Sequence, residues 1–293
     1  MKVINSLRSR SWTNLNRNIC NYLKKPIGSI ASYKSALKFL EEENSRASDF
    51  TINANIGVGG FASVYSALDR RTGKACAVKI NHLDVADTVK CRELAALLSV
   101  TNIDNMIQVK TAYKDDGSLH IVLPLYSDGD LFDHIITNEQ LKENEVKLVI
   151  RQVLCTIRDM HDRGLVHLDL KPENLFITKN SIGEVENVVV GDLGHARRHS
   201  GKALGIFPRM SPGHGSNYSA PEMTLENRFH YKSDVFSVGV IMHAMLHGYL
   251  PIDNGLSKYG DGCAVDLLEL MLHRDIGKRV DADQALNHQW FQL

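Results

Sequence analysis

Three polar side chains whose types suit phosphate chemistry lie close together in VHLDLKPENLF, residues 166–176: Asp169, Lys171 and Asn174. An aspartate can accept the proton of a hydroxyl group, a lysine can place a cation beside a phosphoryl group, and an asparagine oxygen can bind magnesium. A second oxygen ligand follows in VVVGDLG, where a predicted hydrophobic strand ends at Asp192. These residue types can therefore fill the roles that phosphoryl transfer to a hydroxyl group requires.

A second group of residues suited to phosphate lies upstream. The segment IGVGGFASVY, residues 56–65, places Gly57 and Gly59 in a predicted strand–turn–strand. Backbone amides can approach a phosphate closely there because glycine has no Cβ. Lys79 lies on the next predicted strand, where a lysine is usually a surface residue. It could instead hold the α and β phosphates of a nucleotide, with Glu93 on the following predicted helix fixing its direction.

The elements that must position these residues are predicted to be strands first and helices afterwards. Strands are predicted at 50–57, in a hairpin at 63–80 around Thr72-Gly73 and at 118–126, and helices within 85–100, with Asp87 as the cap, and at 144–164. The apolar run 235–246 is shorter than the roughly 20 residues that cross a bilayer, so it predicts a buried helix and no transmembrane segment. The fold class is therefore α+β, with a small sheet-rich lobe before a larger helical lobe.

In chain order, these motifs make residues 50 to 293 resemble a eukaryotic-type protein kinase. The motifs are the Gly-rich loop 57–64, Ala77-Val78-Lys79, Glu93, His167-Leu168-Asp169 with Asn174, Asp192-Leu193-Gly194 and Ala220-Pro221-Glu222. The resemblance implies a bilobal kinase fold with an N-lobe at 50–123, a hinge at 124–127 and a C-lobe at 128–293. Residues 1–49 would form a basic N-terminal extension.

The roles of single residues follow from this resemblance and not from their spacing. It implies four catalytic residues, Asp169, Lys171, Lys79 and Glu93, and two magnesium ligands, Asn174 and Asp192, with ATP and Mg²⁺ as cofactors. It implies an ATP site formed by Ile56, Gly57, Val58, Gly59, Gly60, Phe61, Ala62, Ser63, Val64, Ala77, Lys79 and Leu123. It also implies that Asp234 braces the catalytic loop and that Arg279 pairs with Glu222.

The expected activity is transfer of the γ-phosphoryl group of ATP to serine or threonine hydroxyls of protein substrates, because DLKPEN carries Lys171 as serine/threonine kinases do. Leu168 stands where many family members have an arginine that pairs with a phosphate on the activation segment. We therefore expect an enzyme that does not depend on phosphorylation of this segment.

Two other functions remain open. A pseudokinase scaffold would bind partners, with or without ATP, and would have no turnover. It is kept open by Ala62 in place of the third loop glycine and by Gly215 in place of a usual threonine. It is also kept open by the segment from Asp234 to Arg279, which is shorter than the family pattern by roughly fifteen residues. A small-molecule kinase of related fold is disfavoured by Ala220-Pro221-Glu222 and by DLKPEN.

Charge and cysteine content bear on partners and location. The 34 basic and 34 acidic residues balance, so the chain has no overall positive charge of the kind that indicates nucleic-acid binding. The charge is uneven, however, because the first 40 residues include eight basic and no acidic residues. This basic segment has apolar residues at helical spacing, including Tyr33, Leu37 and Leu40. It could be a loose extension, a helix on the main domain, a contact with a membrane or partner, a transit segment or a secretion leader. Five widely spaced cysteines indicate a reducing compartment, so a cytoplasmic location is expected, with secretion as an effector or organelle targeting left open.

Overall fold

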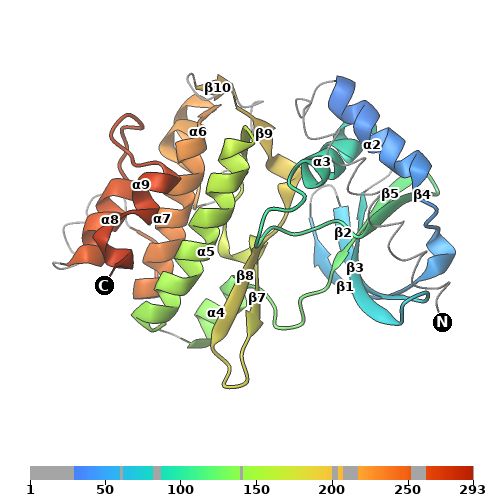
Figure 1. The fold of residues 1–293 in the computed structure, drawn as a ribbon, viewed down its shortest axis with the longest axis horizontal. Helices are drawn as coiled ribbons and strands as arrows, with labels where there is room; N and C mark the ends of the chain where they lie inside the picture. The colour runs from blue at the N-terminus through green and yellow to red at the C-terminus, as the bar shows by residue number, and fades with distance from the viewer. Residues whose placement is uncertain are drawn as a thin grey trace, which may run out of the picture. The chain divides into compact units, whose positions relative to one another are not determined.

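A computed structural model describes residues 30–59, 62–81, 87–138, 141–199, 204–206, 217–251 and 262–292. The chain divides into two compact units, the first containing the described residues up to Asn102 with Ile107–Leu125, and the second containing Ile103–Met106 and the described residues from Tyr126 onward (Figure 1). The change of unit between Leu125 and Tyr126 falls within residues 124–127. The predicted bounds of the extension, lobes and hinge stay a prediction.

Unit 1 contains α2 (Ile30–Glu42), η1 (Ala47–Asp49), β1 (Phe50–Val58), β2 (Ala62–Asp69), β3 (Lys74–Asn81), α3 (Asp87–Ser99), β4 (Thr111–Asp115) and β5 (Ser118–Pro124). Unit 2 contains α4 (Leu131–Asn138), α5 (Glu143–Asp162), β6 (Leu165–Val166), η2 (Pro172–Asn174), β7 (Leu175–Lys179), β8 (Val185–Val190), η3 (Leu193–His195), β9 (Arg197–Arg198), β10 (Gly205–Ile206), α6 (Pro221–Glu226), β11 (Arg228–Phe229), α7 (Tyr231–His247), α8 (Cys263–Met271), α9 (Ala282–Leu286) and η5 (Gln289–Phe291). The predicted α+β class, with a β-rich part before a larger helical part, is confirmed.

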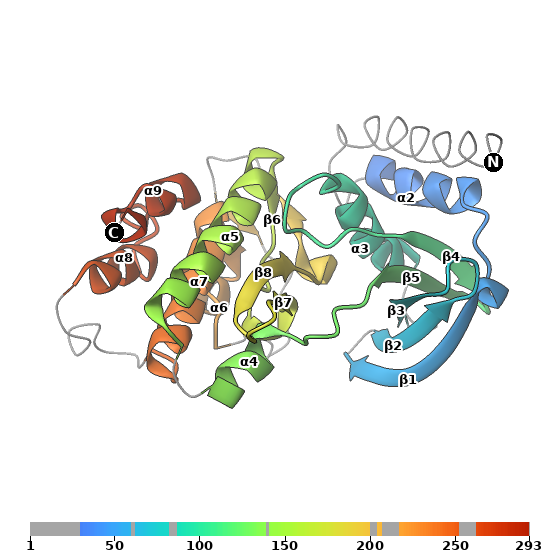
Figure 2. The ribbon, with the colours of Figure 1, turned by 60° about the horizontal axis from the view of Figure 1, so that its bottom comes forward.

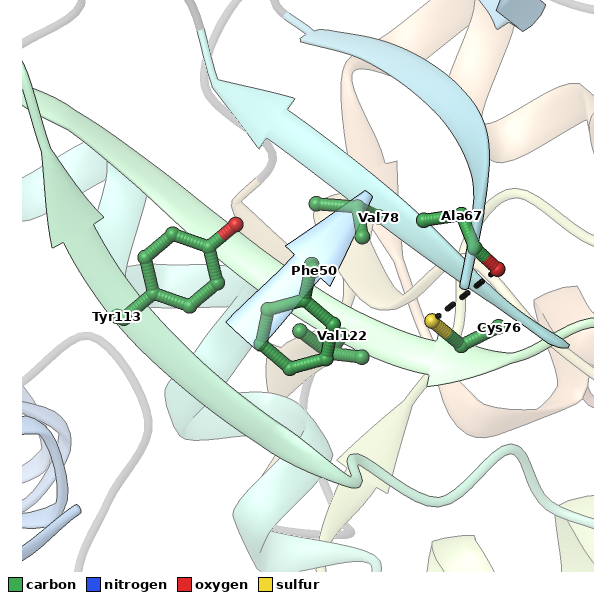
Figure 3. Close-up of a cluster of buried hydrophobic side chains, with 6 residues drawn as sticks. All are labelled: Phe50, Ala67, Cys76, Val78, Tyr113 and Val122. Atoms are coloured by element: carbon green, nitrogen blue, oxygen red, sulfur yellow. Dashed lines mark hydrogen bonds between the residues drawn. The ribbon is translucent and has the colours of Figure 1, made fainter. Parts of the chain in front are cut away.

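The sheet of unit 1 has five antiparallel strands in the order β1-β2-β3-β5-β4. Side chains alternate between its two faces. One face carries an apolar cluster of Phe50, Ala67, Cys76, Val78, Tyr113 and Val122 (Figure 3). The rings of Phe50 and Tyr113 stack there with centroids 5.5 Å apart, and the Cys76 thiol donates a hydrogen bond to the Ala67 carbonyl at 3.6 Å. This cluster leaves the opposite face of β3, with Ala77 and Lys79, for other contacts.

Helix α2 packs against α3 within unit 1 (Figure 2). The predicted amphipathic run does form a helix. Among its side chains described from residue 36 onward, those of Ala36 and Phe39 are buried, whereas those of Leu37 and Leu40 are half-buried. The face that a helix buries depends on where its neighbours lie in the folded chain, and α2 packs against α3.

Unit 2 is built around α5 and α7, which pack against each other, with the β7–β8 hairpin against α5. The apolar run 235–246 is confirmed as part of a buried helix, α7, whose burial on all sides explains its continuous hydrophobicity. Among the described helices, none has the length and apolar character needed to cross a bilayer.

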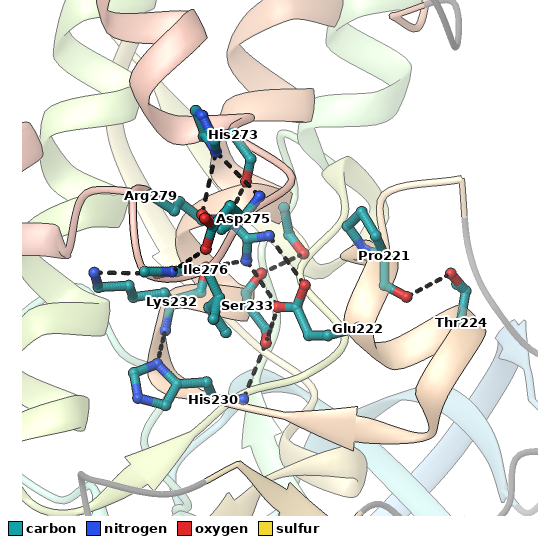
Figure 4. A network of polar contacts seen from close by, with 12 residues as sticks. Pro221, Glu222, Thr224, His230, Lys232, Ser233, His273, Asp275, Ile276 and Arg279 are labelled. Atoms are coloured by element: carbon teal, nitrogen blue, oxygen red, sulfur yellow. Dashed lines mark hydrogen bonds and ion pairs between the residues drawn. The ribbon is translucent and has the colours of Figure 1, made fainter.

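A buried ion pair ties α6 to the chain beyond α8 (Figure 4). Arg279 donates to both carboxylate oxygens of Glu222, at 2.7 and 3.0 Å, so the predicted pairing is confirmed. Ser233 donates to the same carboxylate at 2.6 Å. Burial raises the pKa of Glu222, but the hydrogen bonds and charge of Arg279 outweigh it and the net pKa lies below its ordinary value.

Candidate active site

The face of the unit 1 sheet opposite the apolar cluster brings several predicted ATP-binding residues together. Lys79 on β3 pairs in register with Val64 on β2 and Ile121 on β5. Ala77 on β3 pairs with Leu123 on β5. Residues directly opposite one another on paired strands point to the same face, so Val64, Ala77, Lys79 and Leu123 share one surface.

Lys79 forms an ion pair with Glu93 on α3, with Nζ 2.7 Å from Oε1. The Glu93 side chain is buried and that of Lys79 is largely buried, so solvent screens the pair little. The carboxylate therefore fixes the direction of the ammonium group over the sheet. This is the contact expected if Lys79 is to meet a phosphate.

The Gly-rich loop joins β1 to β2. Its turn is closed by a hydrogen bond from the Gly59 amide to the Ala62 carbonyl at 2.8 Å. Ile56 and Val58 are exposed at the end of β1, whereas Ala62 is buried at the start of β2 and Ser63 is half-buried. Gly57 pairs with Val64 just beyond an irregularity in the strand register. Gly60 and Phe61, also predicted to bind ATP, lie outside the described residues.

In unit 2, the catalytic-loop segment is held by one buried carboxylate from α7. Asp234 accepts hydrogen bonds from the backbone amides of His167 and Leu168, both at 2.8 Å. The Nε2 atom of His161 also lies 2.8 Å from this carboxylate. The prediction that Asp234 braces this loop is confirmed.

The brace holds Leu168 in a left-handed backbone conformation, with φ of 68°. This region is costly for a leucine, so surrounding contacts must maintain it. Leu168 is 4% exposed and belongs to a cluster with Val166, Ala220, Met223 and Phe229. Its side chain thus packs among apolar residues on and beside α6.

Asp169 is brought together with Lys171 and Asn174, as expected. Its Oδ2 atom lies 3.1 Å from Lys171 Nζ and 3.1 Å from Asn174 Nδ2, which also donates to the Asp169 carbonyl at 2.7 Å. His195 Nδ1 lies 3.6 Å from the same Oδ2 atom. Burial raises the pKa of Asp169, but His195 and Lys171 outweigh this effect, so the net pKa is below the ordinary value. The carboxylate is therefore ionised at neutral pH and able to accept a proton.

Asp192 lies on a tight turn next to this group. It has φ of 54°, and its Oδ1 atom accepts the Gly194 amide at 3.1 Å. His167 links the turn to the loop, because its Nε2 donates to the Gly191 carbonyl at 2.8 Å while its Nδ1 accepts the Asp169 amide at 3.3 Å. The Gly191 amide in turn donates to the Asn174 carbonyl at 2.9 Å.

The donor set at Asn174 and Asp192 fits magnesium. Both residues offer hard oxygen ligands, and magnesium is usually held by one or two side chains together with phosphate oxygens and water. Across the described part of the chain, no group of three or more His, Cys, Asp and Glu side chains could hold a metal ion by itself. Asn174 and Asp192 therefore suit a magnesium ion that arrives together with a phosphorylated ligand.

His195 was not predicted as a site residue. It follows directly after Asp192-Leu193-Gly194, so its position in sequence was the only available signal. Gly215, on which the predicted acceptor class partly depends, lies outside the described residues.

Comparisons with known proteins agree with these local arrangements. A family model described as "Protein kinase domain" matches residues 50–291. "Ribosomal protein S6 kinase 2 alpha" of Xenopus laevis is 30% identical over 263 residues, covering 82% of this chain and 35% of the relative. "Ribosomal protein S6 kinase alpha-1" of Homo sapiens is 29% identical over 289 residues, covering 91% of this chain and 38% of the relative. The chain thus spans little more than a third of the length of these curated relatives.

Proposed function

The chain belongs to the protein kinase family, and on that premise we propose that it transfers the γ-phosphoryl group of ATP to serine and threonine hydroxyl groups of proteins. The observation that carries the proposal is the ion pair between Lys79 and Glu93 at 2.7 Å. Protein kinases need this pair in place for catalysis. A chain that had lost phosphoryl transfer would have no catalytic need for a buried lysine–glutamate pair at this position.

In unit 1, Lys79 binds the α and β phosphates of ATP and Glu93 keeps its ammonium group aimed at them. The backbone of the Gly-rich loop around Gly57 and Gly59 supplies amides to the phosphates. Val64, Ala77 and Leu123 supply the apolar surface of the same sheet face for the base of the nucleotide.

In unit 2, Asp169 accepts the proton of the acceptor hydroxyl group and Lys171 places positive charge near the phosphoryl group in transfer. Asn174 and Asp192 are the residues that would hold Mg²⁺. When bound, Mg²⁺ offsets negative charge on the phosphate oxygens. The hydrogen bond from Asn174 Nδ2 to Asp169 leaves the amide oxygen as the chemically suitable donor for the cation.

Serine and threonine are the proposed acceptors because Lys171 follows the serine/threonine pattern and because the relatives named above are ribosomal protein S6 kinases. Protein substrates are proposed for the same reason. No particular substrate follows from these names.

We also propose that activity does not require phosphorylation of the activation segment. Leu168 supports this, because it lies in an apolar cluster with Ala220 and Met223 where an arginine would present a cation. Burial of apolar surface holds these residues together without a phosphate. Replacing Ser200, Ser211, Ser216, Tyr218 and Ser219 by Ala or Phe tests this point. We expect the rate to stay within about tenfold of the wild type; a larger loss in a normally folded variant, above about 1.4 kcal/mol of barrier, would contradict it.

Incubation with radiolabelled ATP, Mg²⁺ and a generic basic protein tests the main proposal. We expect label on serine and threonine, abolished by Lys79→Met and by Asp192→Asn. Lys74→Met is the matched control, because Lys74 lies on the same strand but is exposed at its far end. ATP binding without transfer by the wild type would refute the proposal and favour a pseudokinase.

An intracellular location, and contact of the basic extension 1–49 with a membrane surface or partner, remain proposals. The excess of basic residues in the first 40 positions supports such a contact. Comparing the distribution of the full chain in its native cell with that of a variant whose basic residues in this segment are changed to glutamine tests both.

A further inference from the structure

Helix α3 carries Glu93, and its side chains from residue 91 onward are almost all buried. From Cys91 to Ser99, every side chain is buried except that of Arg92, which is half-buried. A helix that covers a sheet with one face normally exposes a polar stripe on the other. The burial of α3 therefore depends on a further element on its outer side.

Helix α2 supplies cover for α3 within unit 1, since the two helices pack against each other (Figure 2). Ala36 and Phe39 are three residues apart, so they share one face of α2, and both are buried. Lys38 and Glu42 form an ion pair at 3.3 Å and are exposed. Helix α2 is therefore amphipathic, with its apolar face covered and a charged face in solvent.

The chain just after α2 is fastened to the sheet by polar contacts. The hydroxyl group of Thr111 on β4 donates to Glu43 Oε2 at 2.6 Å and lies 2.9 Å from Ser45 Oγ. Arg71, in the turn between β2 and β3, donates to Ser45 Oγ at 3.2 Å. Ser45 and Thr111 are buried, so these bonds are shielded from competing water. The C-terminal end of α2 is thus fixed relative to the strands that carry the candidate site.

We propose that α2 is an internal brace for α3, and that Ala36 and Phe39 are positioning residues that hold Glu93 beside Lys79. The inference rests on the proposed roles of Lys79 and Glu93. It extends them because α2 precedes residue 50, where the match to the family model begins. In this chain, a segment outside the matched domain would help to hold Lys79 and Glu93, the proposed phosphate-binding pair of unit 1, in place.

The physical reason is that the Lys79–Glu93 pair needs the right position of a whole helix and not only of two side chains. Removing the buried Phe39 ring would weaken the packing of α2, the helix that contacts α3 within unit 1. The backbone of α3 would then sample displaced positions in which Glu93 no longer reaches Lys79. The Lys79 ammonium group would lose its fixed orientation for as long as α3 is displaced. Neither Ala36 nor Phe39 is among the proposed nucleotide-binding residues, so both would act through α3.

The test compares Phe39→Ala with Phe50→Ala in the full chain. The two phenylalanines are 4% and 5% exposed and lie in the same unit, but Phe50 belongs to the apolar cluster on the other face of the sheet. Amide hydrogen exchange of residues 91–99 and the dissociation constant for Mg·ATP are measured for both variants. Phe39→Ala should speed exchange of these α3 amides at least about fivefold and weaken Mg·ATP binding by a similar factor. Phe50→Ala should change each by less than about twofold.

Two further variants cover the case in which Phe39→Ala does not fold. Phe39→Leu keeps most of the apolar volume and should restore protection and affinity close to the wild type. Thr111→Val removes the hydroxyl group that fastens the segment after α2 without creating a cavity, and should act in the same direction as Phe39→Ala but less strongly. Unchanged exchange at residues 91–99 in Phe39→Ala and Thr111→Val would overturn the brace. So would an equal effect of Phe50→Ala.

Exchange needs no turnover, so it separates the two proposals. If α3 loosens as expected but the wild type transfers no phosphate, the brace stands and the kinase function fails. If the wild type transfers phosphate and α3 does not loosen, the kinase function stands and the brace fails.

Discussion

The left-handed backbone of Leu168 predicts how stable a glycine variant at this position should be, compared with an alanine variant. At an ordinary buried position, glycine is worse than alanine because it leaves the unfolded chain more freedom, by about 0.4–1 kcal/mol, and lacks a methyl group worth about 0.8 kcal/mol. At φ of 68° an alanine pays about 1–2 kcal/mol that glycine does not. Leu168→Gly should therefore be about as stable as Leu168→Ala.

Leu170 provides the comparison position, because it lies two residues away, is 1% exposed, and is absent from the positive-φ residues of the described chain. Each alanine variant should lose about 2–5 kcal/mol of unfolding free energy through the deleted side chain. The further step to glycine should cost about 1–2 kcal/mol at Leu170 and about zero at Leu168. The difference between these two steps isolates the backbone cost from the packing loss.

Urea unfolding followed by fluorescence is a suitable assay, because Trp290 is buried in unit 2 and reports its unfolding. With a slope of about 1–3 kcal/mol per molar urea, a step of 1 kcal/mol moves the midpoint by about 0.3–1 M. The reasoning is refuted if the step from alanine to glycine costs as much at Leu168 as at Leu170. In that case the backbone at Leu168 would be under no strain, and Asp234 would not be maintaining an unfavourable conformation.

Three further predictions concern unit 2. Arg279→Met should lose about 3–5 kcal/mol of unfolding free energy in urea, because it leaves Glu222 buried without its partner, and adding Glu222→Gln should recover part of the loss. Burial lowers the pKa of His243 from 6.5 to about 4, so as the pH falls the unfolded chain takes up a proton before the folded chain does. The contribution of the neutral His243 to stability is therefore complete above pH 6.5 and is lost as the pH falls toward 4. Thermal unfolding of His243→Gln should show a weaker dependence on pH in this range. A Cβ at Gly191 would lie 2.5 Å from the Phe176 ring, so Gly191→Ala should cost about 1–3 kcal/mol in urea unfolding, and Phe176→Leu in the same chain should relieve it.

The parts of the site that sequence could predict are those with a strong local signal. Strand alternation and the Thr72-Gly73 turn placed Lys79 on a strand, and helical spacing placed Glu93 on the next helix. Their ion pair is observed at 2.7 Å. The bracing of the loop by Asp234 and the pairing of Arg279 with Glu222 were predicted from family resemblance. The sequence around each of these residues carries no local signal for a partner that lies so many positions away.

Strand β4 was missed, although a signal for it exists. Asp116 and Gly117 follow it with φ of 43° and 71°, which is the two-residue turn that joins β4 to β5. An Asp-Gly pair between short apolar segments favours such a hairpin. The five residues of β4 were too few for alternation alone to identify them.

The buried face of α2 and the contact of His195 with Asp169 could not be predicted. Leu37 and Leu40 are more hydrophobic than Ala36, yet Ala36 and Phe39 are buried and the two leucines are half-buried, because the neighbours in the folded chain decide which face is covered. Which helix face is buried and which distant side chains meet are determined by tertiary packing, and this cannot be read from a single sequence.

The loop at residues 166–176 takes its shape from a carboxylate that is synthesised much later than the loop itself. His167 and Asp234 are 67 positions apart, which at about 5–20 residues per second corresponds to a delay of roughly 3–13 s on the ribosome. Until α7 has left the exit tunnel, the amides of His167 and Leu168 have no acceptor to hold them in place. A nascent chain without α7 would thus lack the contacts that shape this loop, and a transcript cut short before this helix would yield a product without a formed loop.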